Sequence, residues 1–370
     1  MARLGLGDAW KCTFANDNDK RKAKSYKENF EGAPELLVRD IAHLSVSDLP
    51  GHADLAWASF PCQDLSLAGS GAGLKGKRSA LFWEFWRLIQ GLSAERRAPR
   101  TVVLENVCGT ITSHGGRDMA ALCEALSGEG YRFAPIVVDA ARFLPQSRPR
   151  LFIVGLRGDN ELKPELLCLG PQAAWHPDTL GIPYDLLGDA ARSNWMWVRL
   201  PAPPRRTRRL ADIIEDKPVG VDWHSPFETR RLLTMMTPIN REKVRAATLM
   251  GRRMIGTVYR RTRPNENGVK VQRAEVRFDD IAGCLRTPSG GSSRQTVLIV
   301  EGRNIRSRLL SPREAARLMG IPERYSLPER YNDAYHLAGD GVAVPVVRHL
   351  SVNLLEPMIS KSRVKQGCAA

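Results

Sequence analysis

The sequence predicts an α/β fold, a doubly wound and mostly parallel sheet, together with a smaller and more irregular domain. Over residues 1–156, short apolar runs alternate with amphipathic stretches, as strands alternate with helices in a doubly wound sheet. Beyond residue 158 the periodicity weakens and prolines, tryptophans and arginines become frequent, until regular patterning returns near residue 308. We therefore expect a first domain at residues 1–158, a second at 159–332, and a C-terminal segment at 333–370 that returns to the first domain.

Each expected element rests on a local pattern. Apolar runs predict strands at residues 13–15, 36–38, 55–60, 101–104, 136–138 and 151–154. Amphipathic or continuous apolar spacing predicts helices at residues 20–30, 79–92, 118–126 and 342–355. Asp19 is placed to cap the first of these helices, and Pro312 directly after Ser311 indicates the start of another.

The composition is that of a soluble protein in a reducing compartment. The chain has 370 residues, 43% hydrophobic and 26% charged, with no apolar run long enough to cross a bilayer. The N-terminus lacks the apolar segment of a signal peptide, so we expect a cytoplasmic protein without a membrane partner. The seven cysteines include no Cys-x-x-Cys pair, which argues against a disulfide framework and a zinc cluster, and we expect no metal.

The charge distribution indicates a polyanionic partner. The net charge is +15, and the segment from Arg199 to Arg263 holds 16 lysines and arginines against 6 acidic residues, an excess of 10. A charge run is often only a solvated face. Concentration of so much of the excess in one segment favours a nucleic-acid surface.

A cysteine stands at the end of the strand expected at residues 55–60. Pro61 and Cys62 end the apolar run, and a segment rich in Gly, Ser and Ala follows at residues 67–76. Ligands of open α/β sheets bind beyond the carboxyl ends of strands, and this place suits a thiol nucleophile that a loop covers. A lone cysteine, however, is more often a packed thiol.

Carboxylates and arginines mark the ends of other expected strands. Asp17, Asp40 and Glu105 each follow an apolar run. One such acid can bind the ribose of a nucleotide-like cofactor, although each alone could be a helix cap. Glu105 directly ends a buried run, where a carboxyl group can stay protonated as an acid. Arg148 and Arg150 enter a buried strand, where an arginine could bind a carbonyl or phosphate oxygen, or form a surface ion pair.

Five motifs, in order along nearly the whole chain, resemble those of the DNA (cytosine-5) methyltransferases. They are Pro61-Cys62-Gln63, Glu105-Asn106-Val107, Gln146-Ser147-Arg148-Pro149-Arg150, the block at residues 308–320, and Gly339-Asp340-Gly341-Val342. The resemblance implies a Rossmann-like fold that uses S-adenosylmethionine as its cofactor. It also implies that the variable segment at residues 160–305 is a target-recognition region for double-stranded DNA.

The resemblance assigns roles to single residues. It implies that Cys62, in its motif with Gln63, is the nucleophile and that Glu105 binds the cytosine. Arg150 would then contact the carbonyl oxygen of the base, with Arg148 in support. The residues implied to hold the cofactor are Asp17 at the ribose, Asp40 and Ile41 beside the adenine, and Asn18, Pro61, Leu81 and Asp340 around the same pocket.

The implied reaction adds the cysteine thiolate to carbon 6 of cytosine, so that carbon 5 can accept a methyl group. The base must leave the duplex, and the loop at residues 64–80 would close over it. Lys75, Lys77 and Arg78 on that loop could meet phosphates or simply face solvent.

The sequence departs from the family pattern at its N-terminus and at three further positions. Residues 1–7 align just after the Phe-x-Gly-x-Gly loop with which the family begins, so we expect that loop and its strand to be missing and the cofactor to bind weakly. Asn18 replaces a larger residue that often stacks on the adenine. Leu144 replaces a common glycine, and Asp340 replaces the usual asparagine.

Other interpretations stay open. One is a truncated relative that binds DNA without efficient methylation. Another is a tRNA cytosine-5 methyltransferase, although the long basic segment favours duplex DNA. A cysteine hydrolase is disfavoured, because no histidine lies in a readable partner position. We expect a monomer, and the sequence gives neither the DNA target nor whether a restriction endonuclease accompanies the protein.

Overall fold

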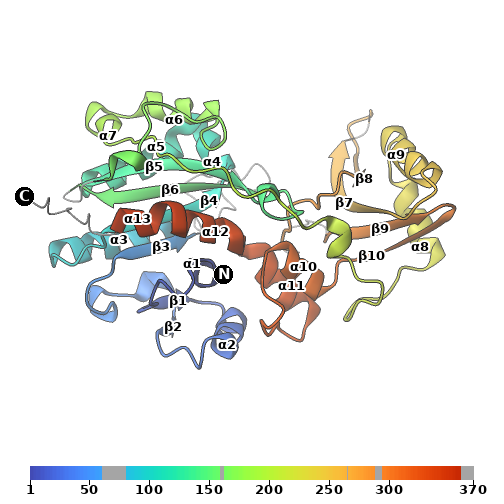
Figure 1. The fold of residues 1–370 in the computed structure, drawn as a ribbon, viewed down its shortest axis with the longest axis horizontal. Coiled ribbons are helices and arrows are strands. Elements are labelled where there is room, and N and C mark those ends of the chain that lie inside the picture. The colour runs from blue at the N-terminus through green and yellow to red at the C-terminus, as the bar shows by residue number, and fades with distance from the viewer. Residues whose placement is uncertain (61–80, 159–161, 265, 288–293, 360–370) are drawn as a thin grey trace, which may run out of the picture.

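The computed structural model describes residues 1–60, 81–158, 162–264, 266–287 and 294–359. Two lobes make up this part of the chain (Figure 1). The larger lobe holds a four-stranded sheet and a two-stranded sheet with helices around them, and the smaller lobe holds a second four-stranded sheet. The α/β fold that the sequence predicts is confirmed.

The central sheet of the larger lobe has the strand order β3-β4-β6-β5. Its strands are β3 (Leu55–Ser59), β4 (Thr101–Val107), β5 (Tyr131–Asp139) and β6 (Pro149–Arg157). β3 and β4 are parallel, whereas β6 runs antiparallel to both of its neighbours. β4 continues through Glu105, which pairs with Phe152 of β6. The placement of Glu105 just beyond a strand was therefore wrong, because backbone pairing extends β4 past its apolar run.

The side chains of β4 alternate between two hydrophobic cores, because successive residues of a strand point to opposite faces of the sheet. Val102 and Leu104 belong to one core, and Val103 belongs to the other. The first core is shared with α3 (Leu81–Ala94) and α5 (Arg117–Gly128). Three short helices lie near α5, namely α4 (Gly109–Thr112), α6 (Gly181–Leu186) and α7 (Asp189–Ser193). The sheet is thus covered by helices on both faces.

The C-terminal helices form much of the second core. They are α10 (Pro312–Leu318), α11 (Tyr331–Asp340), α12 (Val344–Leu350), a π-helix at Ser351–Leu355, and α13 (Glu356–Ile359). By length and composition alone, Tyr331–Ile359 would be long and apolar enough to cross a membrane, but 56% of its most apolar window is buried inside the protein. Residues such as Val347 and Leu354 pack under the sheet, which is the behaviour of core helices.

A separate two-stranded parallel sheet lies beside the central one (Figure 1). It consists of β1 (Ala15–Asp17) and β2 (Leu36–Val38), joined by α2 (Lys20–Asn29) and preceded by α1 (Ala2–Leu6). The strand expected at residues 13–15 begins later, because pairing with β2 starts at Ala15. Asp19 caps α2 as predicted, since its carboxylate accepts the backbone N–H of Arg21 at 2.8 Å. Among the described residues β1 pairs only with β2 and β3 only with β4.

The smaller lobe is an antiparallel sheet of order β10-β9-β7-β8 with two helices packed on it. The strands are β7 (Met254–Pro264), β8 (Lys270–Arg277), β9 (Thr296–Glu301) and β10 (Asn304–Leu309), and the helices are α8 (Pro226–Thr234) and α9 (Pro238–Leu249). Leu232 and Val244 of the helices meet Val258 and Leu298 of the sheet in a small core of its own.

A buried ion pair joins the two lobes. Arg308 at the end of β10 and Glu314 of α10 both have side chains that are 0% exposed, and two guanidinium nitrogens each donate to a carboxylate oxygen at 2.7 Å. The same carboxylate accepts the backbone N–H groups of Ser311 and Glu215, also at 2.7 Å. Arg308 further donates to the Glu215 carbonyl oxygen. Both carboxylate oxygens and both terminal guanidinium nitrogens of the buried pair are thereby bonded, while Nε of Arg308 has no partner among the described residues.

We predict that Glu314→Gln lowers the free energy of unfolding by about 3–5 kcal/mol, because it leaves the Arg308 charge buried without a counter-ion. Urea denaturation measures this loss. The matched control is Glu323→Gln, which removes a carboxylate that also binds an arginine but whose side chain is 62% exposed, and it should cost less than about 1 kcal/mol. Equal losses in the two variants would contradict a special role for the buried pair.

Candidate active site

The reversed direction of β6 brings an acid and an arginine together at one edge of the central sheet. Val107 of β4 pairs with Arg150 of β6, so the start of β6 lies beside the end of β4. The Nε of Arg150 is 3.3 Å from Oε1 of Glu105, and the two side chains are only 15% and 9% exposed. A largely buried carboxylate and guanidinium, both partly open to one side, can hold a polar ring by hydrogen bonds.

The strand that leads to the predicted nucleophile ends at the same place. Ser59, the last residue of β3, pairs with Glu105. The side-chain amide of Asn106 donates to the carbonyl oxygen of Phe60 at 3.3 Å, which fixes the chain one residue before the Pro-Cys-Gln motif. The motif itself, Pro61, Cys62 and Gln63, lies outside the described residues. Sequence reasoning missed the role of Asn106 as an anchor for this turn.

Arg148 is a second buried arginine at this edge, but its contacts differ from those of Arg150. Its two terminal nitrogens donate to three backbone carbonyl oxygens, those of Leu285 at 2.9 Å and of Gly339 and Gly341 at 2.7 Å each. Burial lowers the pKa of this guanidinium. Arg148 therefore ties β6 to the segment before β9 and to the end of α11. Its role in support of Arg150 stays a prediction.

The residues expected around the adenosine part of the cofactor lie at the ends of β1, β2 and the start of α3. Asp17 closes β1, and its carboxylate accepts the backbone N–H of Asp19 at 2.8 Å. Asp40 follows β2 and accepts the N–H of Ala42 at 3.0 Å. Asp40 thus caps the short helix at Ile41–His43, the alternative that the sequence left open, whereas Asp17 bonds the turn before α2, whose cap is Asp19. Their carboxylates keep further acceptor positions for the hydroxyl groups of a ribose.

Apolar and exposed residues complete this region. Ile41 and Leu81 are half-buried, and Asn18 is exposed. Arg87 of α3 donates to the carbonyl oxygen of Leu44 at 2.8 Å, which holds α3 against the turn that contains Ile41. Carboxylates beside two aliphatic side chains suit a nucleoside, so this part of the site fits the adenosine moiety of S-adenosylmethionine.

On the other side of the expected cofactor site, Met1 and Lys22 contact Gly341 and Asp340. The side chain of Met1 lies against Gly341, so closely that a Cβ built at that glycine would be 1.8 Å from the Met1 methyl carbon. Asp340 forms an ion pair of 2.7 Å with Lys22 of α2. The contact of Asp340 with the cofactor, which the sequence suggests, therefore stays a prediction. In this structure the Asp340 carboxylate is paired with Lys22.

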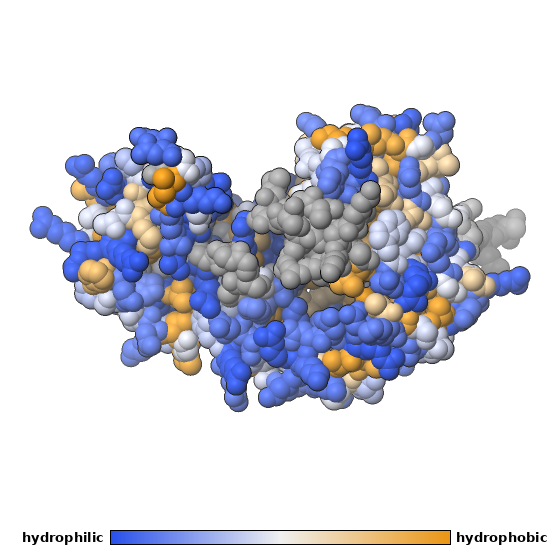
Figure 2. Space-filling model, turned by 180° about the vertical axis from the view of Figure 1, so that it is seen from behind, coloured by the Kyte–Doolittle hydropathy of each residue, from blue (hydrophilic) through white to orange (hydrophobic). Residues whose placement is uncertain are grey.

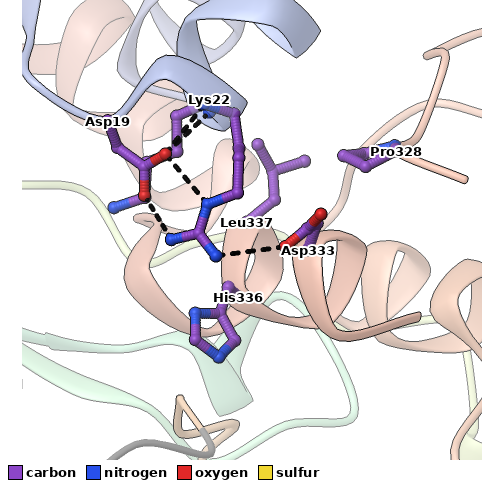
Figure 3. A pocket seen from close by; sticks show the side chains of 7 residues that line it. Asp19, Lys22, Pro328, Asp333, His336 and Leu337 are labelled. Carbon is purple, nitrogen blue, oxygen red and sulfur yellow. Dashed lines mark hydrogen bonds and ion pairs between the residues drawn. The ribbon is translucent and has the colours of Figure 1, made fainter. Parts of the chain in front are cut away.

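A shallow pocket lies next to this ion pair, between α2 and α11 (Figure 3). Arg21 crosses it, binding the Asp19 carboxylate at 2.8 Å and that of Asp333 at 3.2 Å. The hydrogen bonds from Arg21 lower the pKa of Asp19 to about 2. Because its charged groups bind one another, and because neither Glu105 nor Arg150 lines it, this pocket is not the reaction site. Its ion pairs fasten α2 to α11.

The basic segment presents charges between the lobes and on the smaller lobe. The stretch that holds Arg205, Arg206, Arg208 and Arg209 crosses from one lobe to the other (Figure 1). Arg206 binds Asp280 and Arg209 binds Asp212, each at 3.2 Å. Seen from behind, the surface is hollowed between the lobes, and hydrophilic residues are frequent on the left-hand side of the hollow (Figure 2).

A pair of strands in the smaller lobe adds to this charge. Arg261 of β7 stands directly opposite Arg273 of β8. Like charges on facing positions of a sheet destabilise it, and a polyanion nearby would offset that cost.

Among the described residues, no group of three or more His, Cys, Asp or Glu is arranged to hold a metal ion.

Comparisons with known proteins show the family of the chain. A family model described as C-5 cytosine-specific DNA methylase matches residues 2–356. The chain is 27% identical over 355 residues to type II methyltransferase M1.ScrFI of Lactococcus lactis subsp. cremoris, covering 95% of this chain and 74% of that protein. It is 24% identical over 344 residues to M.HhaI of Haemophilus parahaemolyticus, covering 93% and 87%.

Solved structures show the same fold. The S. pombe Dnmt2 methyltransferase superposes with a TM-score of 0.60 at 16% identity, covering 96% of this chain and 94% of that one. A putative DNA modification methyltransferase from an E. coli prophage gives a TM-score of 0.53 at 15% identity, covering 95% and 93%. Since the family model spans most of the sequence, the chain belongs to the C-5 cytosine-specific DNA methylase family, enzymes that transfer a methyl group from S-adenosylmethionine to cytosine in DNA.

Proposed function

We propose that Cys62 is the nucleophile of this methylation and that Glu105 and Arg150 hold the cytosine for it. The observation that carries the proposal is the pair formed by Glu105 and Arg150, 3.3 Å apart at the edge where β3 ends. Because Asn106 anchors Phe60 at that edge, the chain enters the Pro-Cys-Gln motif beside the pair.

The proposed roles follow from the chemistry of the ring. The Cys62 thiolate adds to carbon 6, and the electron pair displaced from the 5,6 double bond makes carbon 5 nucleophilic. Glu105 hydrogen-bonds the ring nitrogen and exocyclic amine, and Arg150 bonds the carbonyl oxygen, so that both stabilise the charge that develops. When bound, S-adenosylmethionine supplies the methyl group that carbon 5 accepts. Loss of the proton from carbon 5 then restores the double bond and expels the thiolate.

The remaining assignments are part of the same proposal. Asp17, Asp40, Ile41 and Leu81 hold the adenosine moiety of the cofactor. The expected target-recognition domain at residues 159–332 includes the smaller lobe, although α6, α7 and α10 within this range pack on the larger lobe, and residues 1–158 and 333–370 form the catalytic domain. The enzyme acts as a cytoplasmic monomer. The names of its relatives, type II methyltransferases, support an accompanying restriction endonuclease as a partner.

The nucleophile is tested by trapping. DNA that carries 5-fluorocytosine at the target position should form a stable covalent adduct with the enzyme in the presence of the cofactor, because fluorine cannot leave carbon 5 as a proton does. Denaturing electrophoresis measures the yield. Cys62→Ser should abolish the adduct, whereas Cys108→Ser, a matched thiol whose pKa is raised to about 11 by burial, should keep it. An adduct of equal yield in Cys62→Ser would refute the assignment.

DNA contact by the basic segment is tested through its salt dependence. Arg205 and Arg208 are exposed, whereas Arg206 and Arg209 already bind acids. The double variant Arg205→Gln with Arg208→Gln should flatten the plot of log affinity against log salt by about two units, roughly one for each lost phosphate contact. The control, Arg206→Gln with Arg209→Gln, should change the slope less. An unchanged slope in the first double variant would show that these arginines do not meet phosphates.

A further inference from the structure

Arg148 is a buried cation without a carboxylate partner in the described part of the chain. Its side chain is fully surrounded, and its terminal nitrogens bind three carbonyl oxygens and one sulfur atom, the Sγ of Cys284, at 3.3 Å from Nη1. Its Nε has no hydrogen-bond partner among these residues. A guanidinium keeps its proton in proteins, and a buried charge without a counter-ion is costly. The contact that can become anionic is the thiol.

Cys284 lies between both arginines of the site. Its sulfur is 4.0 Å from Nη2 of Arg150, the residue whose Nε contacts Glu105. Burial raises the pKa of a thiol, but the charges of Arg148, Arg150 and the neighbouring Arg286 outweigh burial and leave the pKa of Cys284 below its ordinary value. Cys123, which is buried without such neighbours, shows the opposite shift, because burial raises its pKa.

We propose that Cys284 is a positioning residue, whose thiolate is the counter-ion that fixes the guanidinium groups of Arg148 and Arg150 and thereby holds Arg150 against Glu105. The proposal rests on the roles proposed for Arg150 and Glu105. A chain of charges then runs from Glu105 through Arg150, Cys284 and Arg148 to the carbonyl oxygens at the end of α11. It connects the central sheet to the segment that returns from the smaller lobe.

A thiolate suits this place better than a carboxylate. The Cys284 sulfur contacts Arg150 only through Nη2, at 4.0 Å, so it can neutralise charge while Nε stays beside Glu105. A carboxylate at the same point would take the N–H groups of Arg150 in a bidentate pair. The other ionisable groups that face Cys284 are Tyr335 of α11, which stays neutral because burial raises its pKa to about 12, and Glu105 beyond Arg150.

The ionisation of Cys284 is measured without altering it. In the full chain with Cys12→Ser, Cys62→Ser and Cys368→Ser, the remaining cysteines besides Cys284 are Cys108, Cys123 and Cys168, and burial raises the pKa of all three. Thiolate absorbance near 240 nm should therefore rise by one equivalent below about pH 8.5, the ordinary thiol value. No rise below that pH would overturn the proposal. This readout needs no catalysis, so a failure of the Cys62 assignment leaves it interpretable.

The positioning role is measured by charge replacement. Cys284→Ser keeps the size of the side chain but stays neutral, and it should slow single-turnover methylation about ten- to a hundredfold, since a small misplacement of a binding group has effects of that order. The low-pH limb of the pH–rate profile of this variant should no longer reflect ionisation of the thiol. Cys284→Asp restores the charge but its carboxylate also competes for the N–H groups of Arg150, so it should recover only part of the rate, with the low-pH limb of the pH–rate profile moved to lower pH. If Cys284→Ser fails to fold while Cys284→Asp folds, the need for an anion is supported. Equal rates and pH profiles in wild type and Cys284→Ser would overturn it.

Discussion

The direction of a single strand is the constraint on which this active site depends. β6 runs antiparallel between β4 and β5, so residues at its beginning lie beside residues at the end of β4. Had β6 been parallel, Arg150 would lie at the opposite edge of the sheet from Glu105, since the strands would start together. The hydrogen-bond ladder between Val107 and Arg150 therefore does more than join strands. It sets which two side chains meet.

Two buried arginines show different ways of holding a charge inside this protein. Arg308 binds a carboxylate with both terminal nitrogens, and the pair is complete. Arg148 binds carbonyl oxygens, which carry only partial charges, and one thiol. The first arrangement fastens the two lobes where no substrate needs to reach. The second lies directly behind Arg150, where a full carboxylate would compete for the hydrogen bonds that catalysis uses.

The sequence predicts the central strands of the larger lobe because β4, β5 and β6 are largely buried and contain apolar runs. Val102, Val103 and Leu104 are all fully covered, and such a run is visible without any structure. In the smaller lobe β9 is also a buried apolar run, but β7 and β8 carry charged residues on an open face and show no clear apolar alternation. The motifs identified Glu105 and Arg150, but they gave no sign of Cys284. Cys284 is one of seven scattered cysteines. Only the arginines that the fold brings beside it indicate a role.

The cofactor side of the enzyme is held together by side chains rather than by a continuous sheet. β1 and β2 form their own small sheet and have no strand in common with the central sheet in the described part of the chain. The connection includes the ion pairs of Lys22 with Asp340 and of Arg21 with Asp333. Apolar packing adds to it, because Gly5 of α1 lies against Val347 of α12 and the side chains of Leu4 and Leu6 pack on the core that holds Val347. The position of Asp17 and Asp40 relative to Glu105 therefore depends in part on α11. Since Arg148 binds the carbonyl oxygens at the end of that same helix, the reaction edge and the cofactor unit share one support.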